Sequence, residues 1–237
     1  MTSRRSREAT IDCLQMMAEA KSTLVKIDGI GSELLPAIAA WQDDEPIGYA
    51  IVQNPFATGP LTLTNLTIAA RLMVSGWHAD ALAVVMEGYV EDANPFVDSN
   101  HKALAERFPT DNRIREALWV AYTNVKGDAC MGITCFSQEL GRTVKFDDPE
   151  LSSDDQLDDF SEEGTIPHML TKALKEVSPT PIPKHFTIDQ CRKRMAQEIH
   201  LLGFSVYLHG SEDSWVTFYS DEGDGLPWVP PDYPDLG

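Results

Sequence analysis

The chain has 237 residues, 43% of them hydrophobic, and a formal net charge of −18 at pH 7. This length and composition are sufficient for a substantial core, in one large domain or in one medium domain with a smaller one. The longest uncharged apolar run, residues 81–86, is too short to cross a bilayer, so we expect no membrane partner. The excess of acids disfavours direct nucleic-acid binding, because it repels the phosphates.

Most of the negative charge lies in two stretches that contain no basic residue. Residues 146–165 carry nine acids and residues 210–237 carry seven. The rest of the chain is close to neutral, with 21 acids against 19 bases. The net charge is therefore a property of one internal segment and one tail.

The N-terminal part of the chain is predicted to be helical. Residues 9–26 place apolar side chains along one stripe, and Asp28-Gly29 ends the pattern. A second helix is predicted from Ser32, its N-cap, to Trp41, with Pro36 in its first turn.

The next segment is expected to change from strand to helix. The apolar pattern of residues 47–53 predicts a strand. Residues 61–64 (LTLT) leave strand and helix open, because they alternate like a strand but lead into a helical pattern. Residues 65–75 are predicted to form a helix that stops at Gly76.

The middle of the chain carries the main sheet signals. Residues 81–90 are mostly apolar, which is typical of a central strand. Residues 117–125 and 130–137 flank the turn residues 126–129, which predicts a hairpin with Trp119 and Ile133 packed inside. The other elements predicted here are a helix at residues 99–108 and a strand at residues 142–146.

The C-terminal third begins with a helix from Thr165, followed by a proline-rich linker at residues 178–184. Thr187 caps a further helix that Gly203 ends. Residues 204–209 and 215–219 are predicted to pair as a hairpin.

Three consecutive strands with short turns predict an α+β fold, a mostly antiparallel sheet with helices on one face, followed by a small α-α-β-β unit. A doubly wound nucleotide fold is not expected, because the glycine-rich phosphate motifs are absent. The expected divisions are a main domain at residues 9–146, an acidic linker at 147–164, a helix/hairpin unit at 165–219 and an acidic Pro/aromatic tail at 220–237.

The cysteines indicate neither a disulfide nor a metal site. Cys13, Cys130, Cys135 and Cys191 form no CxxC or Cys/His ligand spacing. Cys130 and Cys135 lie five residues apart in one predicted strand, and an odd offset places them on opposite faces. We expect reduced thiols, and no cofactor or metal.

Two segments carry a partial resemblance. Residues 77–90 (WHADALAVVMEGYV) and 115–136 (REALWVAYTNVKGDACMGITCF) resemble a segment type of uncharacterised α/β proteins from bacteria and phages. The resemblance implies no activity, but it favours a phage-associated protein. We therefore expect a cytoplasmic protein, or a virion component if it is phage-encoded; Arg4, Arg5 and Arg7 precede no apolar stretch that would make an export signal.

The weak catalytic candidates are His78, Asp80 and Glu87, which suggest a small hydrolase as one alternative. A histidine with two carboxylates can perform general acid–base chemistry, and burial of Glu87 would raise its pKa. The competing interpretation is that His78 lies in an exposed turn and that Glu87 meets an edge or a basic partner such as Arg115.

The candidate partner-binding residues lie in the acidic segment and the tail. Asp154, Asp155, Asp158 and Asp159 would form one ridge if the segment became helical beside a basic surface. Such a ridge can be a docking strip for a basic protein, a mimic of DNA phosphates, or a solvated linker. In the tail, Trp228 and Tyr233 need a surface to pack on, in this protein or in a partner.

These observations favour a non-enzymatic acidic interaction or assembly protein that docks on basic protein surfaces. The first alternative is a DNA-mimic inhibitor of a nucleic-acid-binding enzyme. A homo-oligomer or a larger assembly is compatible with either function.

Overall fold

A computed structural model describes residues 4–53, 59–91, 114–139, 143–152, 165–209 and 215–217. Its helices are α1 (Arg4–Asp28), α2 (Gly59–Trp77), α4 (Ile166–Glu176) and α5 (Ile188–Leu201). Its strands are β1 (Ala37–Gln42), β2 (Glu45–Val52), β3 (Ala81–Glu91), β4 (Ile114–Asn124), β5 (Ala129–Glu139), β6 (Thr143–Phe146), β7 (Glu150–Leu151), β8 (Phe204–His209) and β9 (Trp215–Thr217).

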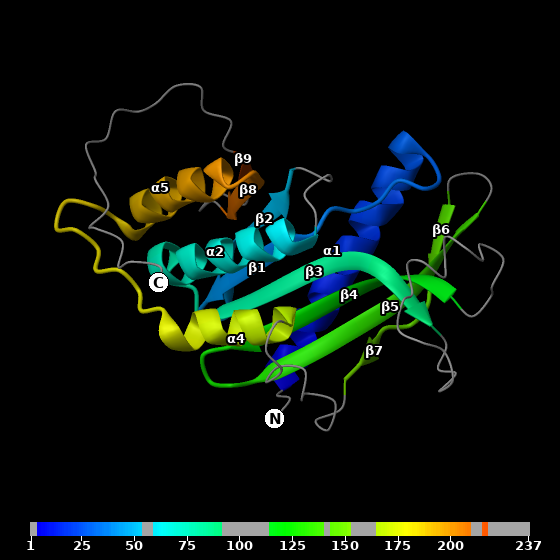
Figure 1. The fold of residues 1–237 in the computed structure, drawn as a ribbon, viewed down its shortest axis with the longest axis horizontal. Helices are drawn as coiled ribbons and strands as arrows, with labels where there is room; N and C mark the ends of the chain where they lie inside the picture. The colour runs from blue at the N-terminus through cyan, green and yellow to red at the C-terminus, as the bar shows by residue number, and fades with distance from the viewer. Residues whose placement is uncertain are drawn as a thin grey trace.

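The described strands form one sheet in the order β6-β5-β4-β3-β1-β2-β8-β9, with β7 paired to β5 (Figure 1). Every pairing between these strands is antiparallel, which confirms the predicted α+β class. Both β2 and β3 run antiparallel to β1, so the connection through α2 crosses over β1.

Helices cover both faces of the sheet, whereas one covered face was expected. On β3, Leu82 and Val84 belong to the core cluster with α2, α4 and α5, whereas Ala83 and Val85 belong to the cluster with α1. A strand that is apolar on both faces must be covered on both. The helix α1 therefore covers one face of the sheet alone, whereas α2, α4 and α5 together cover the other.

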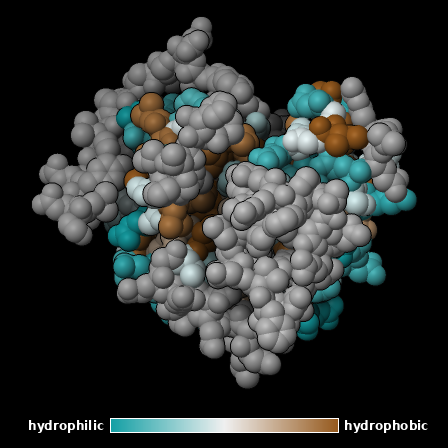
Figure 2. Space-filling model, turned by 45° about the vertical axis from the view of Figure 1, so that its right-hand side comes forward, coloured by the Kyte–Doolittle hydropathy of each residue, from teal (hydrophilic) through white to brown (hydrophobic). Residues whose placement is uncertain are grey.

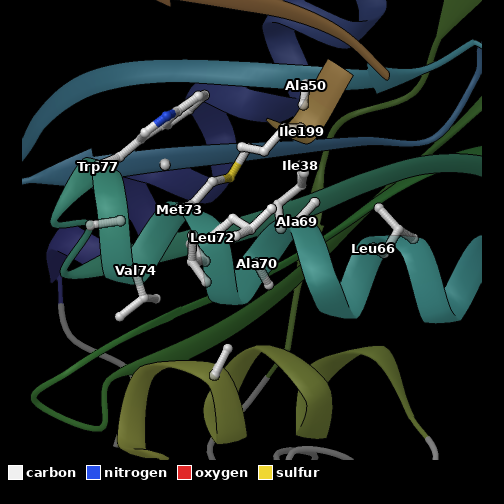
Figure 3. Packing of buried hydrophobic residues seen from close by; sticks show 14 of the residues in the cluster. Ile38, Ala50, Leu66, Ala69, Ala70, Leu72, Met73, Val74, Trp77 and Ile199 are labelled. Carbon is white, nitrogen blue, oxygen red and sulfur yellow. The ribbon is translucent and has the colours of Figure 1, made fainter. Parts of the chain in front are cut away.

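The cluster under α2 is the larger of the two. Figure 3 shows Met73 and Trp77 extending from α2 toward Ile199 of α5, while Val74 points toward α4. Trp77 is fully buried, and its ring nitrogen donates to the carbonyl oxygen of Arg192 at 3.1 Å. The helix thus joins the sheet to both C-terminal helices.

The helix predicted from Ser32 to Trp41 is wrong, because this segment leads into the β1–β2 hairpin. Asp43 and Asp44 form the turn with φ angles of 52° and 71°, which is the type I′ geometry that hairpins favour. The alanines of β1 favour a helix locally, but pairing with both β2 and β3 outweighs that preference. An Asp-Asp pair between two apolar runs was the overlooked turn signal.

Residues 61–64, for which the sequence left strand and helix open, are part of α2 in the structure. The helix continues past Gly76 to Trp77. A Cβ on Gly76 would lie 2.5 Å from the Met195 side chain, so this glycine allows α5 to pack closely rather than ending α2. The strands predicted at residues 47–53, 81–90 and 142–146, the hairpin at 117–137 and both C-terminal helices are confirmed within a few residues. The helix predicted at residues 99–108 lies outside the described residues.

Cys13, Cys130, Cys135 and Cys191 are thiols that form no disulfide in the structure. Cys130 and Cys135 both lie in β5, at positions of opposite parity. Burial raises the pKa of the Cys13 thiol to about 12, with a smaller contribution from Asp12, so this thiol stays protonated at neutral pH.

The C-terminal elements share the sheet and core of the preceding part of the chain. Five residue pairs join β2 to β8, from Gly48↔Leu208 to Val52↔Phe204. A Cβ on Gly48 would lie 2.3 Å from the carbonyl oxygen of Tyr207, so the backbones approach as only glycine permits. The β2–β8 pairing therefore joins the helix/hairpin unit to the main sheet.

We predict that Gly48→Ala lowers the free energy of unfolding by about 1–3 kcal/mol, because the β2–β8 pairing must shift to admit the methyl group. Gly88→Ala is the matched control on β3, since a Cβ there meets no atom within 4 Å. It should leave stability unchanged or raise it slightly. Urea denaturation of both variants measures the difference, and equal effects would contradict the close approach.

We also predict that Trp77→Ala is more destabilising than Trp119→Ala. Trp77 is fully buried, so its truncation should cost about 4 kcal/mol. Trp119 pairs with Ile133, as expected of the hairpin, but is only half-buried, and its truncation should cost about 2 kcal/mol. Chemical denaturation gives the order, and a larger loss for Trp119→Ala would refute it.

Candidate functional site

His78 anchors the linker that precedes α5. It follows the last residue of α2 with a positive φ of 59°. Its Nε2 lies 2.9 Å from the carbonyl oxygen of Thr180, and because a carbonyl only accepts, Nε2 carries the proton in this contact. The backbone amide of Thr180 donates to Ser75 at 2.7 Å, so two hydrogen bonds fasten the linker to the end of α2.

Asp80 fastens the β1–β2 turn. Its Oδ2 accepts a hydrogen bond of 2.8 Å from the backbone amide of Asp43, which holds the strained turn in place. Its own backbone amide donates to Trp41, and its carbonyl accepts from Val125. Asp80 therefore ties three chain segments together at one end of the sheet.

Glu87 lies away from these two residues and has a different partner. It is seven residues beyond Asp80 along β3, which is about 23 Å at the usual rise of a strand. Its Oε1 lies 2.6 Å from Nζ of Lys21, and its Oε2 accepts from the backbone amide of Leu34 at 2.8 Å. The structure thus does not bring His78, Asp80 and Glu87 together in one site.

Lys21 and Glu87 form a buried ion pair on the α1 face of the sheet. The Lys21 side chain is 0% exposed and that of Glu87 is 8% exposed. Nζ of Lys21 also donates to the carbonyl oxygen of Ser32 at 2.5 Å and lies 4.9 Å from the centre of the Phe136 ring. The ammonium group is therefore held by a carboxylate, a carbonyl and an aromatic face.

A second set of polar contacts holds the loop at residues 29–34, to which Ser32 and Leu34 belong. The backbone amide of Gly31 donates to Oε1 of Gln138 at 2.9 Å, and the amide nitrogen of Gln138 donates to Glu116 at 3.0 Å. With the contacts of Ser32 and Leu34, these bonds hold residues 29–34 against α1 and the sheet. We call Lys21, Glu87, Glu116, Gln138 and this loop the Lys21–Glu87 cluster.

Burial raises the pKa of Glu87 above its ordinary value, and the nearby Glu116 carboxylate adds to this effect. Hydrogen bonds from Leu34 and Lys21 and the charge of Lys21 oppose it. A raised carboxyl pKa is also a property of catalytic acids. Here the partners occupy both carboxylate oxygens, so the arrangement serves to lock the loop.

Sequence reasoning missed Lys21, although its position was a signal. Lys21 interrupts the buried stripe of α1 that runs through Leu14, Met17 and Val25. A lysine in such a stripe needs a buried acceptor, and Glu87 was the acid that interrupted an apolar strand. Lys21 and Glu87 are both charged residues in otherwise apolar patterns, and matching them with each other would have predicted the ion pair.

Arg115, the expected partner of Glu87, instead pairs with Asp147. The carbonyl oxygen of Asp147 accepts from the Thr134 hydroxyl at 2.7 Å, so the first part of the acidic segment is attached to the sheet. All six predicted partner-binding residues lie outside the described residues; they are Asp154, Asp155, Asp158, Asp159, Trp228 and Tyr233.

Within the described ranges, no three His, Cys, Asp or Glu side chains are grouped so that they could hold a metal ion. Among the described helices, none is long and apolar enough to span a membrane. Comparison with known proteins finds no matching family model, curated protein or solved structure. The resemblance to segments of bacterial and phage proteins therefore stays a prediction.

We predict that Lys21→Met lowers the free energy of unfolding by about 3–5 kcal/mol at neutral pH, because Glu87 loses its buried counter-ion. The loss should shrink as the pH falls below about 4, where the carboxyl is protonated in both states. As the pH rises from there, the unfolded state ionises freely while the buried carboxyl does not, so stability is lost.

Denaturation with urea across this pH range measures the effect. Arg115→Met is the matched control, because its pair with Asp147 is partly exposed and should contribute no more than about 1 kcal/mol. The double variant Lys21→Met, Glu87→Leu should recover part of the loss. A pH-independent loss, or equal losses in Lys21→Met and the control, would contradict a buried charge pair.

Proposed function

We propose that the protein is a non-enzymatic interaction or assembly protein that docks on basic protein surfaces through its acidic segment and its aromatic tail. The observation that carries this proposal is the distribution of charge. Sixteen of the 37 acids lie in two stretches without a single base, while the rest of the chain is nearly neutral. Uncompensated charge of one sign attracts a surface of the opposite sign.

The contacts of the folded body support this division. Several of its charged side chains pair with each other, as Lys21 does with Glu87, Arg192 with Asp189 and Arg194 with Glu198. In the sequence, residues 153–164 of the acidic segment connect β7 to the start of α4, and the tail follows β9. Both stretches are therefore joined to strands of the same sheet, which suits bivalent docking.

The proposal extends to the setting of the protein. A phage-associated protein, present in the cytoplasm or in the virion, would meet basic partners during assembly. Mimicry of DNA remains the alternative function of the same acids, because carboxylates at phosphate-like spacing would bind the same type of surface.

We predict that replacing Asp154, Asp155, Asp158 and Asp159 by Asn abolishes capture of basic partners by the immobilised full chain. Binding by the unaltered chain should weaken as the salt concentration rises beyond about 0.15 M, because the contact is electrostatic. The control replaces Asp12, Glu19, Glu33 and Glu45, four exposed acids of the body, by their amides. This control removes the same charge and should leave capture unchanged.

Two further arms separate docking from mimicry. In the double variant Trp228→Ala, Tyr233→Ala, docking should lose affinity, because buried aromatic side chains dominate interface energetics. Excess duplex DNA should not compete with docking. Competition by DNA, with tolerance of the aromatic changes, would instead support the mimic, and equal capture by both acid variants would end the proposal.

A further inference from the structure

A pocket between α2 and α4 carries positive charge on this strongly acidic protein. Arg71 of α2 and His168 and Lys172 of α4 line it, and its volume is about 210 Å³. Its apolar wall is supplied by Leu63, Met169 and Ala173. The two helices lie side by side over the sheet in Figure 1, and Figure 2 shows that hydrophobic residues (brown) as well as hydrophilic ones (teal) reach the surface of the molecule.

One acid partly compensates the charge of this pocket. A carboxylate oxygen of Glu176 lies 3.6 Å from Arg71, and the other lies 4.0 Å from Lys172. A single carboxylate is thus shared between two cations, which leaves a net positive charge. The helix α4 adds to it, because it carries a second lysine, Lys175, and no acid other than Glu176.

The size of the pocket indicates what it can hold. Pockets for small-molecule ligands usually have volumes of about 300–1,000 Å³, whereas this one has about 210 Å³. Such a space suits one large apolar side chain, with the cations at its rim available for carboxylates. The matching ligand is an acidic peptide with an aromatic anchor.

The tail of this chain is such a peptide. Residues 218–237 contain five acids, no base and four aromatic residues, Phe218, Tyr219, Trp228 and Tyr233. We propose that the pocket between α2 and α4 binds the tail of the same chain, with Trp228 in the pocket and neighbouring carboxylates beside Arg71 and Lys172. The proposal takes from the proposed function only the idea that the tail is a docking segment.

The distance across the sheet allows this contact within one chain. The tail starts after β9, which lies four strand positions from β3 and five from β4, the strands that α4 contacts. At about 4.8 Å per strand this is roughly 19–24 Å. Trp228 is 11 residues beyond Thr217. A flexible segment of that length has a root-mean-square span of about 17–20 Å, and a fully extended one reaches about 36 Å.

Matching span and length favour the intramolecular contact, because the effective concentration is then highest. A tail held in this way is withheld from external partners. A basic partner must then compete with Arg71 and Lys172 for the tail carboxylates. The pocket would thus regulate the docking activity.

The test is ¹⁹F NMR of the full chain with 5-fluorotryptophan, with the Trp228 resonance assigned by Trp228→Phe. We expect this resonance to differ from that of a synthetic peptide of residues 218–237. The double variant Arg71→Gln, Lys172→Gln should move it to the free-peptide position, as should salt raised to about 0.5 M. Glu176→Gln should make the bound signal more resistant to salt, because it removes the competing carboxylate.

The control variant is Lys126→Gln, Lys175→Gln, which removes two exposed lysines, one from the β4–β5 turn and one from α4 outside the pocket. It should leave the Trp228 resonance unchanged. The resonances of Trp41, Trp77 and Trp119 report the fold and should be unaffected in both variants. A free-peptide signal for Trp228 in the unaltered chain, or equal shifts in both variants, would overturn the proposal.

A tenfold dilution distinguishes the two possible arrangements. An unchanged bound fraction supports the contact within one chain, whereas a fall on dilution means that the tail enters another copy and overturns it. The sample contains no external partner, so failure here leaves the proposed function standing. Conversely, a bound tail without any basic partner would support the pocket even if the proposed function failed.

Discussion

The buried pair of Lys21 and Glu87 is the constraint on which the α1 face of the structure depends. It joins a helix, a central strand and the loop at residues 29–34, three segments that are distant in sequence. Because both side chains are buried, a shift of α1 along the sheet would leave both charges without a partner and largely without water. Because the loop leads directly into β1, the same contact determines where the first hairpin enters the sheet.

The sequence predicted the elements whose local signals agree with their environment. The turn at Gly127 and the caps at Thr165 and Thr187 are fully local, and the structure has them where expected. The region from Ser32 to Trp41 failed because its helix-favouring residues are buried between two strands, and only long-range pairing decides that outcome. The sequence analysis also did not predict that helices cover both faces of the sheet, although the apolar run of β3 implied two covered faces.

The candidate site was less predictable than the fold, for a related reason. His78 and Asp80 are near each other in sequence, but each binds a backbone group from another part of the chain. Both residue types are common in catalytic sites, but in this structure His78 holds a linker and Asp80 holds a turn. Lys21 was visible as an exception in an apolar stripe, yet its partner lies 66 residues away. Contacts of this kind require the fold before they can be assigned.

The pairing of β2 with β8 has a consequence for how the protein forms. The paired residues Gly48 and Leu208 are 160 positions apart, whereas β3, β4 and β5 follow one another in the chain. During synthesis the meander can pair early, but β2 stays an unpaired edge until residues 204–208 have emerged. Such long loop closure slows folding and exposes the nascent chain to strand-pairing with neighbours. The strand β8, which is made 150 residues or more after the first hairpin, is therefore the one that covers the open edge of that hairpin.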